Sequence, residues 1–172
     1  MLSDNVQDKK SMNRPSRQLV TFSLDERKFA LYAAAVRRII RVVERTPLPK
    51  APDIVPGIIN MQGQVIPVFD IRMRFRLPPR EVRLDDQMII ATAANRTVAL
   101  IVDSVNEVIE TPEGRIIAAE QILPELEYVA GIMKTEDGMI LIHDLERFLS
   151  LPEEKDLDEA MEALNRDDRK AG

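Results

Sequence analysis

The sequence of 172 residues contains no cysteine and a single histidine, His143. The lack of cysteine excludes disulfide bonds, thiolate nucleophiles and cysteine-ligated metal sites. It also fits a reducing compartment such as the cytoplasm. A lone histidine excludes the histidine-rich zinc sites as well. These absences remove several common classes of enzyme, and we expect neither a metal nor a cofactor.

Aromatic residues make up only 4% of the chain, so the predicted core consists of Val, Ile, Leu and Met. No apolar run approaches the roughly 18 residues that a membrane-spanning helix needs. The N-terminal segment also lacks the apolar core of a signal peptide. We therefore predict a soluble, cytoplasmic protein without direct membrane contact.

The net charge of −5 opposes a general affinity for nucleic acids. The stretch 72–76, Arg-Met-Arg-Phe-Arg, offers one aromatic ring for base stacking, so we predict no nucleic-acid partner. Arginines nevertheless gather at 37–45 and 72–83. They are interpreted either as solvated outer faces or as a surface for an acidic partner.

The chain is organised around residues 56–72, P-G-I-I-N-M-Q-G-Q-V-I-P-V-F-D-I-R. Two short apolar stretches, 58–61 and 65–71, meet at Gln62-Gly63. Both are too short for helices, and glycine adopts a positive φ without steric cost. The pattern predicts a buried β-hairpin with a tight turn.

Similar short runs predict strands at 18–24, 28–32, 36–43, 87–94, 97–110, 115–117, 129–134 and 139–143. In the run 97–110, the part after residue 106 is read as an extension of the preceding strand. The alanines at 33–35 favour a brief helical turn. About ten strands with few helices indicate a mainly β protein, a barrel or a sandwich.

Three further segments complete the predicted organisation. Residues 1–17 are polar without periodicity, and we expect a disordered tail. The polar segment 74–86 contains Pro78-Pro79, and the boundary between two lobes is predicted there. Helical spacing begins near residue 144, so residues 152–172 are expected to form a C-terminal helix and tail.

No enzyme template fits the chain. His143 lies in the apolar run I-L-I-H-D, which favours a partly buried, hydrogen-bonded imidazole over a catalytic base. Asp70, Asp103 and Asp144 each lie near the end of a predicted strand. Unless these carboxylates converge they cannot bind a metal, and capping or turn hydrogen bonds are the simpler role. We therefore predict that the protein is not an enzyme.

Three blocks of the sequence resemble the bacterial chemotaxis coupling protein (CheW) family. The strongest is G-I-I-N-M-Q-G-Q-V-I-P-V-F-D-I-R at 57–72, with the family's glycine, asparagine, proline and D-[LI]-R positions. The second is V-A-L-I-V-D-S-V-N-E-V at 98–108. The third combines Y-V-A-G-I at 128–132 with M-I-L-I-H-D-L-E-R-F-L at 139–149. The blocks occur in the family's order, so residues 18–151 are identified as a CheW-like domain.

The resemblance implies two five-stranded, SH3-like β-barrels bridged by a C-terminal helix. It also implies an adaptor that links the cytoplasmic tip of a methyl-accepting chemoreceptor to the regulatory domain of a CheA-type histidine kinase. Such a protein would be recruited to membrane-bound receptor arrays. An alternative is a scaffold of the same type in a pathway with another output, such as surface motility or gene control.

The resemblance also implies two sets of contact residues. The kinase-facing set comprises Val36, Arg38, Ile39 and Gly57. The receptor-facing set, in a groove between the barrels, comprises Gln62, Gly63, Val65, Val105 and Val108. Core packing is the simpler role for the valines and the isoleucine, because such residues in strands are usually buried. For Gly63, the turn alone can explain the residue.

Two positions depart from the family pattern. Gln62 stands where the family usually has arginine, and Arg38 stands where it usually has an acidic residue. Glutamine cannot supply the charge of an arginine, and Arg38 reverses the sign of a contact. We hypothesise that the protein serves its own receptor and kinase, with compensating charges on the partner.

Overall fold

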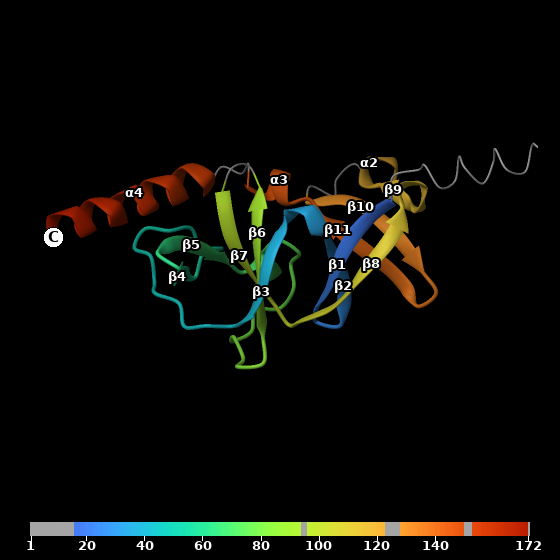
Figure 1. The fold of residues 1–172 in the computed structure, drawn as a ribbon, viewed down its shortest axis with the longest axis horizontal. Helices are drawn as coiled ribbons and strands as arrows, with labels where there is room; N and C mark the ends of the chain where they lie inside the picture. The colour runs from blue at the N-terminus through green and yellow to red at the C-terminus, as the bar shows by residue number, and fades with distance from the viewer. Residues whose placement is uncertain (1–15, 94–95, 123–127, 150–152, 172) are drawn as a thin grey trace, which may run out of the picture.

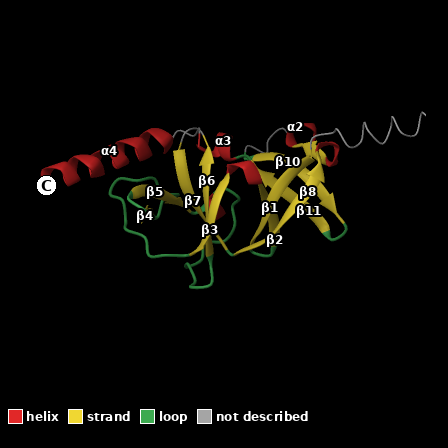
Figure 2. Ribbon diagram, in the orientation of Figure 1, coloured by secondary structure: helices red, strands yellow, loops and turns green. Residues whose placement is uncertain are grey.

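The structure is a computed structural model that describes residues 16–93, 96–122, 128–149 and 153–171. It is mainly β, with two sheets that lie side by side and few helices (Figures 1 and 2). This confirms the predicted fold class. Most of the predicted N-terminal tail lies outside the described residues, while Ser16 and Arg17 already belong to the first strand.

One sheet combines strands from both ends of the chain, and we call it the terminal subdomain. Its strands are β1 (Ser16–Leu24), β2 (Arg27–Tyr32), β8 (Ser104–Pro112), β9 (Ile116–Ala118), β10 (Val129–Thr135) and β11 (Gly138–His143). Their order is β8-β1-β2-β11-β10-β9, so a sixth, three-residue strand joins the five that the resemblance implied.

The other sheet comes from the middle of the chain, and we call it the central subdomain. Its strands are β3 (Val36–Arg41), β4 (Gly57–Met61), β5 (Gln64–Phe69), β6 (Gln87–Ala93) and β7 (Arg96–Val102), in the order β3-β6-β7-β5-β4. Beyond β3, Thr46 pairs with Ile58 of β4 through two backbone hydrogen bonds of 2.8 and 2.9 Å. This pairing joins the chain that follows β3 to β4, at the other edge of the sheet, and so closes the sheet into a barrel.

The predicted lobe boundary near 74–86 is wrong. That segment connects β5 to β6, which belong to the same sheet. The chain instead passes between the subdomains at the predicted helical turn, Ala33–Ala35, and again at Asp103. A proline-rich break marks the end of a strand, but it does not reveal which distant strands will pair.

The strand predicted at 97–110 is two strands in two different sheets. It ends at Val102, because Asp103 turns the chain toward the other subdomain. There the Asp103 backbone N–H donates to the Ser23 carbonyl at 3.0 Å, and the Asp103 carboxylate accepts from the Asp25 N–H at 2.8 Å. These bonds start the pairing of β8 with β1.

The predicted central hairpin is confirmed as β4 and β5. Its turn consists of Gln62 and Gly63, which have positive φ values of 52° and 84°. The Gly63 N–H donates to the Asn60 side chain at 3.0 Å and fixes the turn. Local turn chemistry is therefore enough to place this element.

A continuous apolar core joins the two subdomains. It contains Phe22, Phe29 and Leu31 of the terminal sheet together with Phe69, Ile89 and Leu100 of the central sheet. Apolar burial is the main source of folding free energy, so a shared core holds the subdomains as one body.

Helix α3 (Leu145–Leu149) lies where the subdomains meet. The ring of Phe148 makes edge-to-face contacts with Phe69 of β5 at 5.2 Å and with His143 of β11 at 5.1 Å. The bridge that the resemblance assigned to the C-terminal helix is thus made by α3. A second short helix, α2 (Ala119–Ile122), follows β9.

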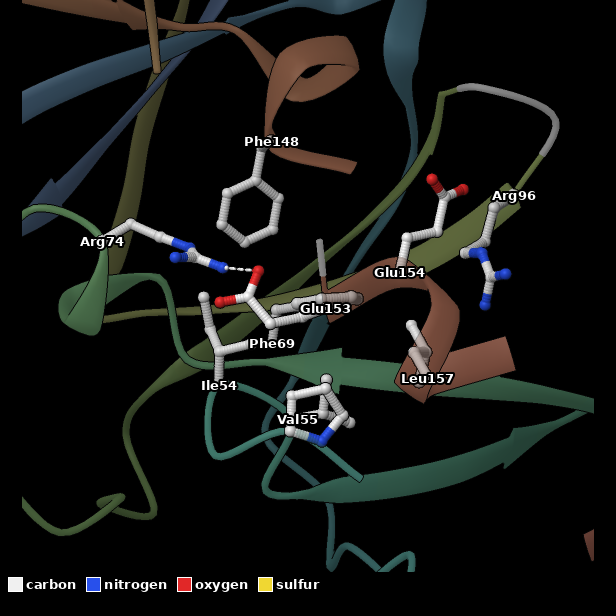
Figure 3. A pocket seen from close by; sticks show the side chains of 10 residues that line it. Ile54, Val55, Phe69, Arg74, Arg96, Phe148, Glu153, Glu154 and Leu157 are labelled. Atoms are coloured by element: carbon white, nitrogen blue, oxygen red, sulfur yellow. Dashed lines mark ion pairs between the residues drawn. The ribbon is translucent and has the colours of Figure 1, made fainter. Parts of the chain in front are cut away.

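The predicted C-terminal helix is α4 (Glu153–Ala171), which packs its first turns on the central subdomain. Figure 3 shows Leu157 over an apolar pocket lined by Ile54 and Val55. At its rim, Arg74 forms an ion pair with Glu153 at 2.6 Å. This pair lowers the pKa of the Glu153 carboxyl, chiefly through the hydrogen bond from Arg74.

Candidate partner-binding surfaces

Strand β3 is largely exposed, and its exposed side chains are both basic and apolar. Its exposed side chains are Arg37, Arg38, Ile39 and Arg41, followed by Val43 just beyond the strand, and we call these residues the β3 surface. Ile39 is 40% exposed and Val43 is 45% exposed. Exposed apolar side chains interleaved with cations are typical of a contact surface rather than of a core.

The charges on this surface are available to a partner. Among the residues that the structure describes, Arg38 and Arg41 belong to no ion pair. Arg37 donates one long hydrogen bond, 3.3 Å, to Thr92. Three exposed guanidinium groups on one strand therefore create a positive surface that attracts carboxylates.

Not all of the kinase-facing set lies on the exposed face. Val36 is half-buried and packs against the shared core, and a β-bulge separates it from Arg38. Gly57 is buried, and a Cβ atom there would stand 2.6 Å from the Thr46 carbonyl oxygen. Arg38 and Ile39 are adjacent and exposed, whereas the close approach of Thr46 gives Gly57 a packing role.

Sequence reasoning missed one exposed residue next to the β3 surface. Leu84 is 94% exposed, in the loop before β6. With Arg41, Asp85 and Gln87 it lines a hollow of about 380 Å³. A leucine in a polar, proline-broken segment was the available signal, although Leu77 of the same segment is buried in the core.

Strand β8 carries the exposed part of the receptor-facing set. Val108 is 60% exposed, opposite the buried Val20 of β1. Val105 is half-buried and packs against the shared core. Of these two valines, Val108 is the one that exposes most of its side chain to solvent.

The rest of the receptor-facing set lies on the other subdomain. Gln62 and Gly63 are exposed at the β4–β5 turn, and Val65 is half-buried against the shared core. Figure 1 shows β4 and β5 on the far side of β3 and β6 from β8. The structure therefore does not gather the five residues into one exposed patch.

A network of charged side chains at the subdomain junction was not predicted. Arg72 is only 5% exposed and pairs with Asp25 of the β1–β2 turn and with Asp103. Arg80 pairs with Asp103 at 2.5 Å and with the buried Asp86 at 2.7 Å. The interpretation of the 72–83 arginines as a solvated face is wrong for Arg72 and Arg80, because paired charges can be buried.

The network keeps its members charged. Burial opposes the charge of Arg72, but hydrogen bonds to Asp103 and Asp25 outweigh it and raise the pKa of the guanidinium. The hydrogen bond to Asp86 likewise raises the pKa of Arg80. Burial alone would raise the pKa of Asp103, yet the hydrogen bond from Arg72 brings it below its usual value.

The three strand-end carboxylates have separate structural roles. Asp70 accepts from the Arg72 N–H at 3.2 Å, and Asp144 caps α3 by accepting from the Arg147 N–H at 3.0 Å. Asp103 belongs to the charged network. Within the described ranges, no group of three or more metal-ligating side chains converges. Capping and turn bonds therefore account for Asp70 and Asp144, as the sequence suggested.

His143 differs from the predicted hydrogen-bonded imidazole. It is 1% exposed, and its ring packs edge-to-face on Phe75 at 5.3 Å and on Phe148. Neither ring nitrogen has a hydrogen-bond partner among the described residues. Burial lowers the pKa of His143 to about 3, so the ring is neutral at pH 7.

Comparisons with known proteins agree with this architecture. The family model described as a CheW-like domain matches residues 18–153. A probable chemotaxis protein CheW of Rhizobium etli is 28% identical over 82% of this chain and 92% of its own length. Protein FrzA of Myxococcus xanthus is 26% identical over 64% of this chain and 74% of its own length.

A solved structure is similar over nearly the whole domain. The crystal structure of the scaffolding protein TtCheW from Thermoanaerobacter tengcongensis superposes with a TM-score of 0.74 at 33% identity. The match covers 81% of this chain and 96% of that one. Among the described helices, none is long and apolar enough to cross a membrane.

Proposed function

The chain belongs to the CheW-like domain family of chemotaxis scaffold proteins, and we propose that it couples chemoreceptor cytoplasmic tips to the regulatory domain of a CheA-type histidine kinase. One observation carries the proposal. The exposed β3 surface and the exposed Val108 lie on different subdomains that share one core. An adaptor needs two contact surfaces on a rigid body, and this arrangement supports such a role.

The kinase is proposed to bind the β3 surface. Arg38 and Ile39 are its exposed centre, flanked by Arg41 and Val43. Because Arg38 stands where the family usually has an acidic residue, the complementary kinase surface is expected to be acidic. A like-charged surface would be repelled, so the reversed sign also selects the partner.

The receptor tip is proposed to bind the β8 side. Val108 is the exposed apolar residue there. An apolar side chain of this kind contributes binding free energy mainly when the partner buries it away from water. Gln62 and Gly63 would belong to the receptor contact only if the receptor also reached the β4–β5 turn. The protein is proposed to act in the cytoplasm, recruited to receptor arrays without touching lipid.

Calorimetry with two fragments tests the proposal. One fragment is the regulatory domain of the histidine kinase encoded nearest to this protein, and the other is a chemoreceptor tip. We expect binding to both. Arg38→Glu should weaken kinase binding about tenfold and leave receptor binding unchanged, and Val108→Lys should do the opposite.

Each outcome has a distinct meaning. Binding to neither fragment would overturn the adaptor function. Tight kinase binding that Arg38→Glu does not change would leave the adaptor in place and refute the acidic kinase surface. Because both side chains are exposed, neither substitution should impair folding, which thermal unfolding can check.

A second candidate is a scaffold of the same kind in a pathway with a different output. The observation that favours this candidate is the similarity to Protein FrzA of Myxococcus xanthus, a relative that is not named as a chemotaxis protein. The two candidates differ in the response regulator that the coupled kinase phosphorylates. Reconstitution of the kinase with each neighbouring regulator distinguishes a flagellar output from surface motility or gene control.

A further inference from the structure

Gln87 touches the strands of both proposed partner surfaces. It is the first residue of β6, where it pairs in register with Arg41 of β3. Its side-chain oxygen, Oε1, accepts a hydrogen bond of 2.7 Å from the Val105 N–H of β8. A single residue therefore connects the strand of the β3 surface to the strand that carries Val108.

A second route runs beside Gln87 through charged groups. The Val42 N–H, just past β3, donates to the Asp86 carbonyl at 3.0 Å. Asp86 is only 2% exposed, and its carboxylate pairs with Arg80. Arg80 also donates a hydrogen bond to Asp103 at 2.5 Å. Asp103 immediately precedes β8. The route thus begins at the end of β3 and ends at the start of β8.

Both routes lie in a partly buried environment where hydrogen bonds are hard to replace. A buried donor or acceptor that loses its partner pays its full desolvation cost, and a charged one pays more. Asp103 is further held by Arg72 and by the Asp25 N–H. A shift of β8 must therefore break these bonds or carry Asp86, Gln87 and β3 along with it.

We propose that Arg80, Asp86, Gln87 and Asp103, which we call the junction link, couple partner binding on β8 to partner binding on β3. These are positioning residues, because none of them belongs to the β3 surface and none is Val108. Gln87 acts through its backbone pairing with Arg41 and its hydrogen bond with Val105. The inference rests on the proposed adaptor function. It adds that binding of one partner changes the affinity of the protein for the other. Coupling between two sites is a free energy and is reciprocal.

The test measures kinase affinity with and without a saturating receptor-tip fragment, and then receptor affinity with and without the kinase domain. For each partner, the coupling ratio is its affinity in the presence of the other partner divided by its affinity alone. In the unmodified protein we expect the two ratios to be equal and to differ from one by about fivefold or more. Gln87→Met removes the acceptor for Val105 at similar volume, and Arg80→Met cuts the charged route. Each should bring the ratio toward one while changing each separate affinity by less than about twofold.

Matched controls use the same substitutions at exposed positions that are not part of the junction link. Gln121→Met and Arg76→Met should leave the ratio unchanged, since both side chains are exposed and outside the junction link. Amide exchange provides a readout that a general loss of stability would not produce. Kinase binding to β3 should slow exchange at the Val105 N–H in the unmodified protein and in Gln121→Met, but not in Gln87→Met.

The outcomes separate the two proposals. Failure of both fragments to bind refutes the adaptor function. Binding of both fragments with a ratio of one in the unmodified protein overturns the junction link alone, as does a ratio that persists in both link variants. If Arg80→Met does not fold, Arg80→Lys keeps the charge but lacks the fork that reaches Asp86 and Asp103 together, and it should lower the ratio partly.

Discussion

The α-carbon of Gly57 faces the Thr46 backbone so closely that a Cβ atom would stand 2.6 Å from the Thr46 carbonyl oxygen. That oxygen accepts the Ile58 N–H in the pairing that closes the central barrel. A side chain at position 57 must therefore push the barrel open. The glycine is required for packing, whatever partner the neighbouring surface binds.

We predict that Gly57→Ala lowers the free energy of unfolding by about 2 kcal/mol, as overpacking against backbone does. Gly63→Ala is the matched control, because a Cβ there meets no heavy atom within 4 Å. Its cost should be about 1 kcal/mol, from the positive φ of 84°. Urea unfolding measures both values. Equal losses at the two positions would contradict the packing role of Gly57.

Arg72 is expected to be the most sensitive residue of the charged network. It is 5% exposed and pairs with both Asp25 and Asp103, so its removal takes this cation from Asp25 and leaves Asp103 with Arg80 alone. We predict that Arg72→Met lowers the free energy of unfolding by about 3 kcal/mol. Arg76→Met, at an exposed position of the same segment, should change it by less than about 0.5 kcal/mol. Denaturant titration of both variants checks this.

His143 should make the protein less stable in mild acid. The folded state holds the pKa of His143 at about 3, below the value of about 6.5 in an unfolded chain. Below about pH 6.5 the unfolded state therefore binds a proton that the folded state refuses, so stability falls as the pH falls from about 6.5 to about 3. From pH 7 to pH 5 the loss should be about 2 kcal/mol.

The measurement is chemical unfolding at pH 7, 6 and 5 for the natural chain and for His143→Leu. The leucine variant lacks the titrating group and fits an apolar site between Phe75 and Phe148. The free energy of unfolding of this variant should fall much less between pH 7 and pH 5. An identical pH dependence in both proteins would mean that other groups cause the acid sensitivity.

Association with the kinase domain should depend on salt through the β3 surface. Charges on exposed side chains steer association and are screened over about 10 Å at an ionic strength of 0.1 M. We predict that the association rate falls as salt rises and that Arg38→Gln makes this dependence shallower. Arg166→Gln, at an exposed arginine of α4, is the control that should retain the natural slope. Stopped-flow kinetics at several salt concentrations measures the slope for the natural chain and for both variants. Equal slopes in all three proteins would contradict the prediction.

The elements that sequence predicted well depend on neighbours along the chain. The β4–β5 hairpin follows from two short apolar runs and the pair Gln62-Gly63, whose positive φ values are a local preference. The helical turn at Ala33–Ala35 likewise follows from local propensity. The exposure of Arg38 agrees with the general preference of arginine for the surface, a preference that failed for the paired Arg72.

Other features depend on contacts between distant parts of the chain. The lobe boundary was misplaced because β8 pairs with β1 and β11 pairs with β2, and no local pattern specifies such partners. The burial of Arg72 depends on Asp25 and Asp103, which lie 47 and 31 positions away in the sequence. The burial of His143, whose ring nitrogens have no hydrogen-bond partner in the described part of the chain, depends in the same way on the aromatic rings of Phe75 and Phe148.

The sequence by itself determined the family, the β-rich fold and most strands, because these depend on local turn chemistry, alternation and motif residues. Only the tertiary structure decided that Gly57 is a packing glycine, that Val108 is exposed while Val105 is half-buried, and that Gln87 joins β3 to β8. The physical reason is that burial and hydrogen-bond partnership belong to pairs of residues. Those pairs come together only when strands that are distant in sequence have found one another.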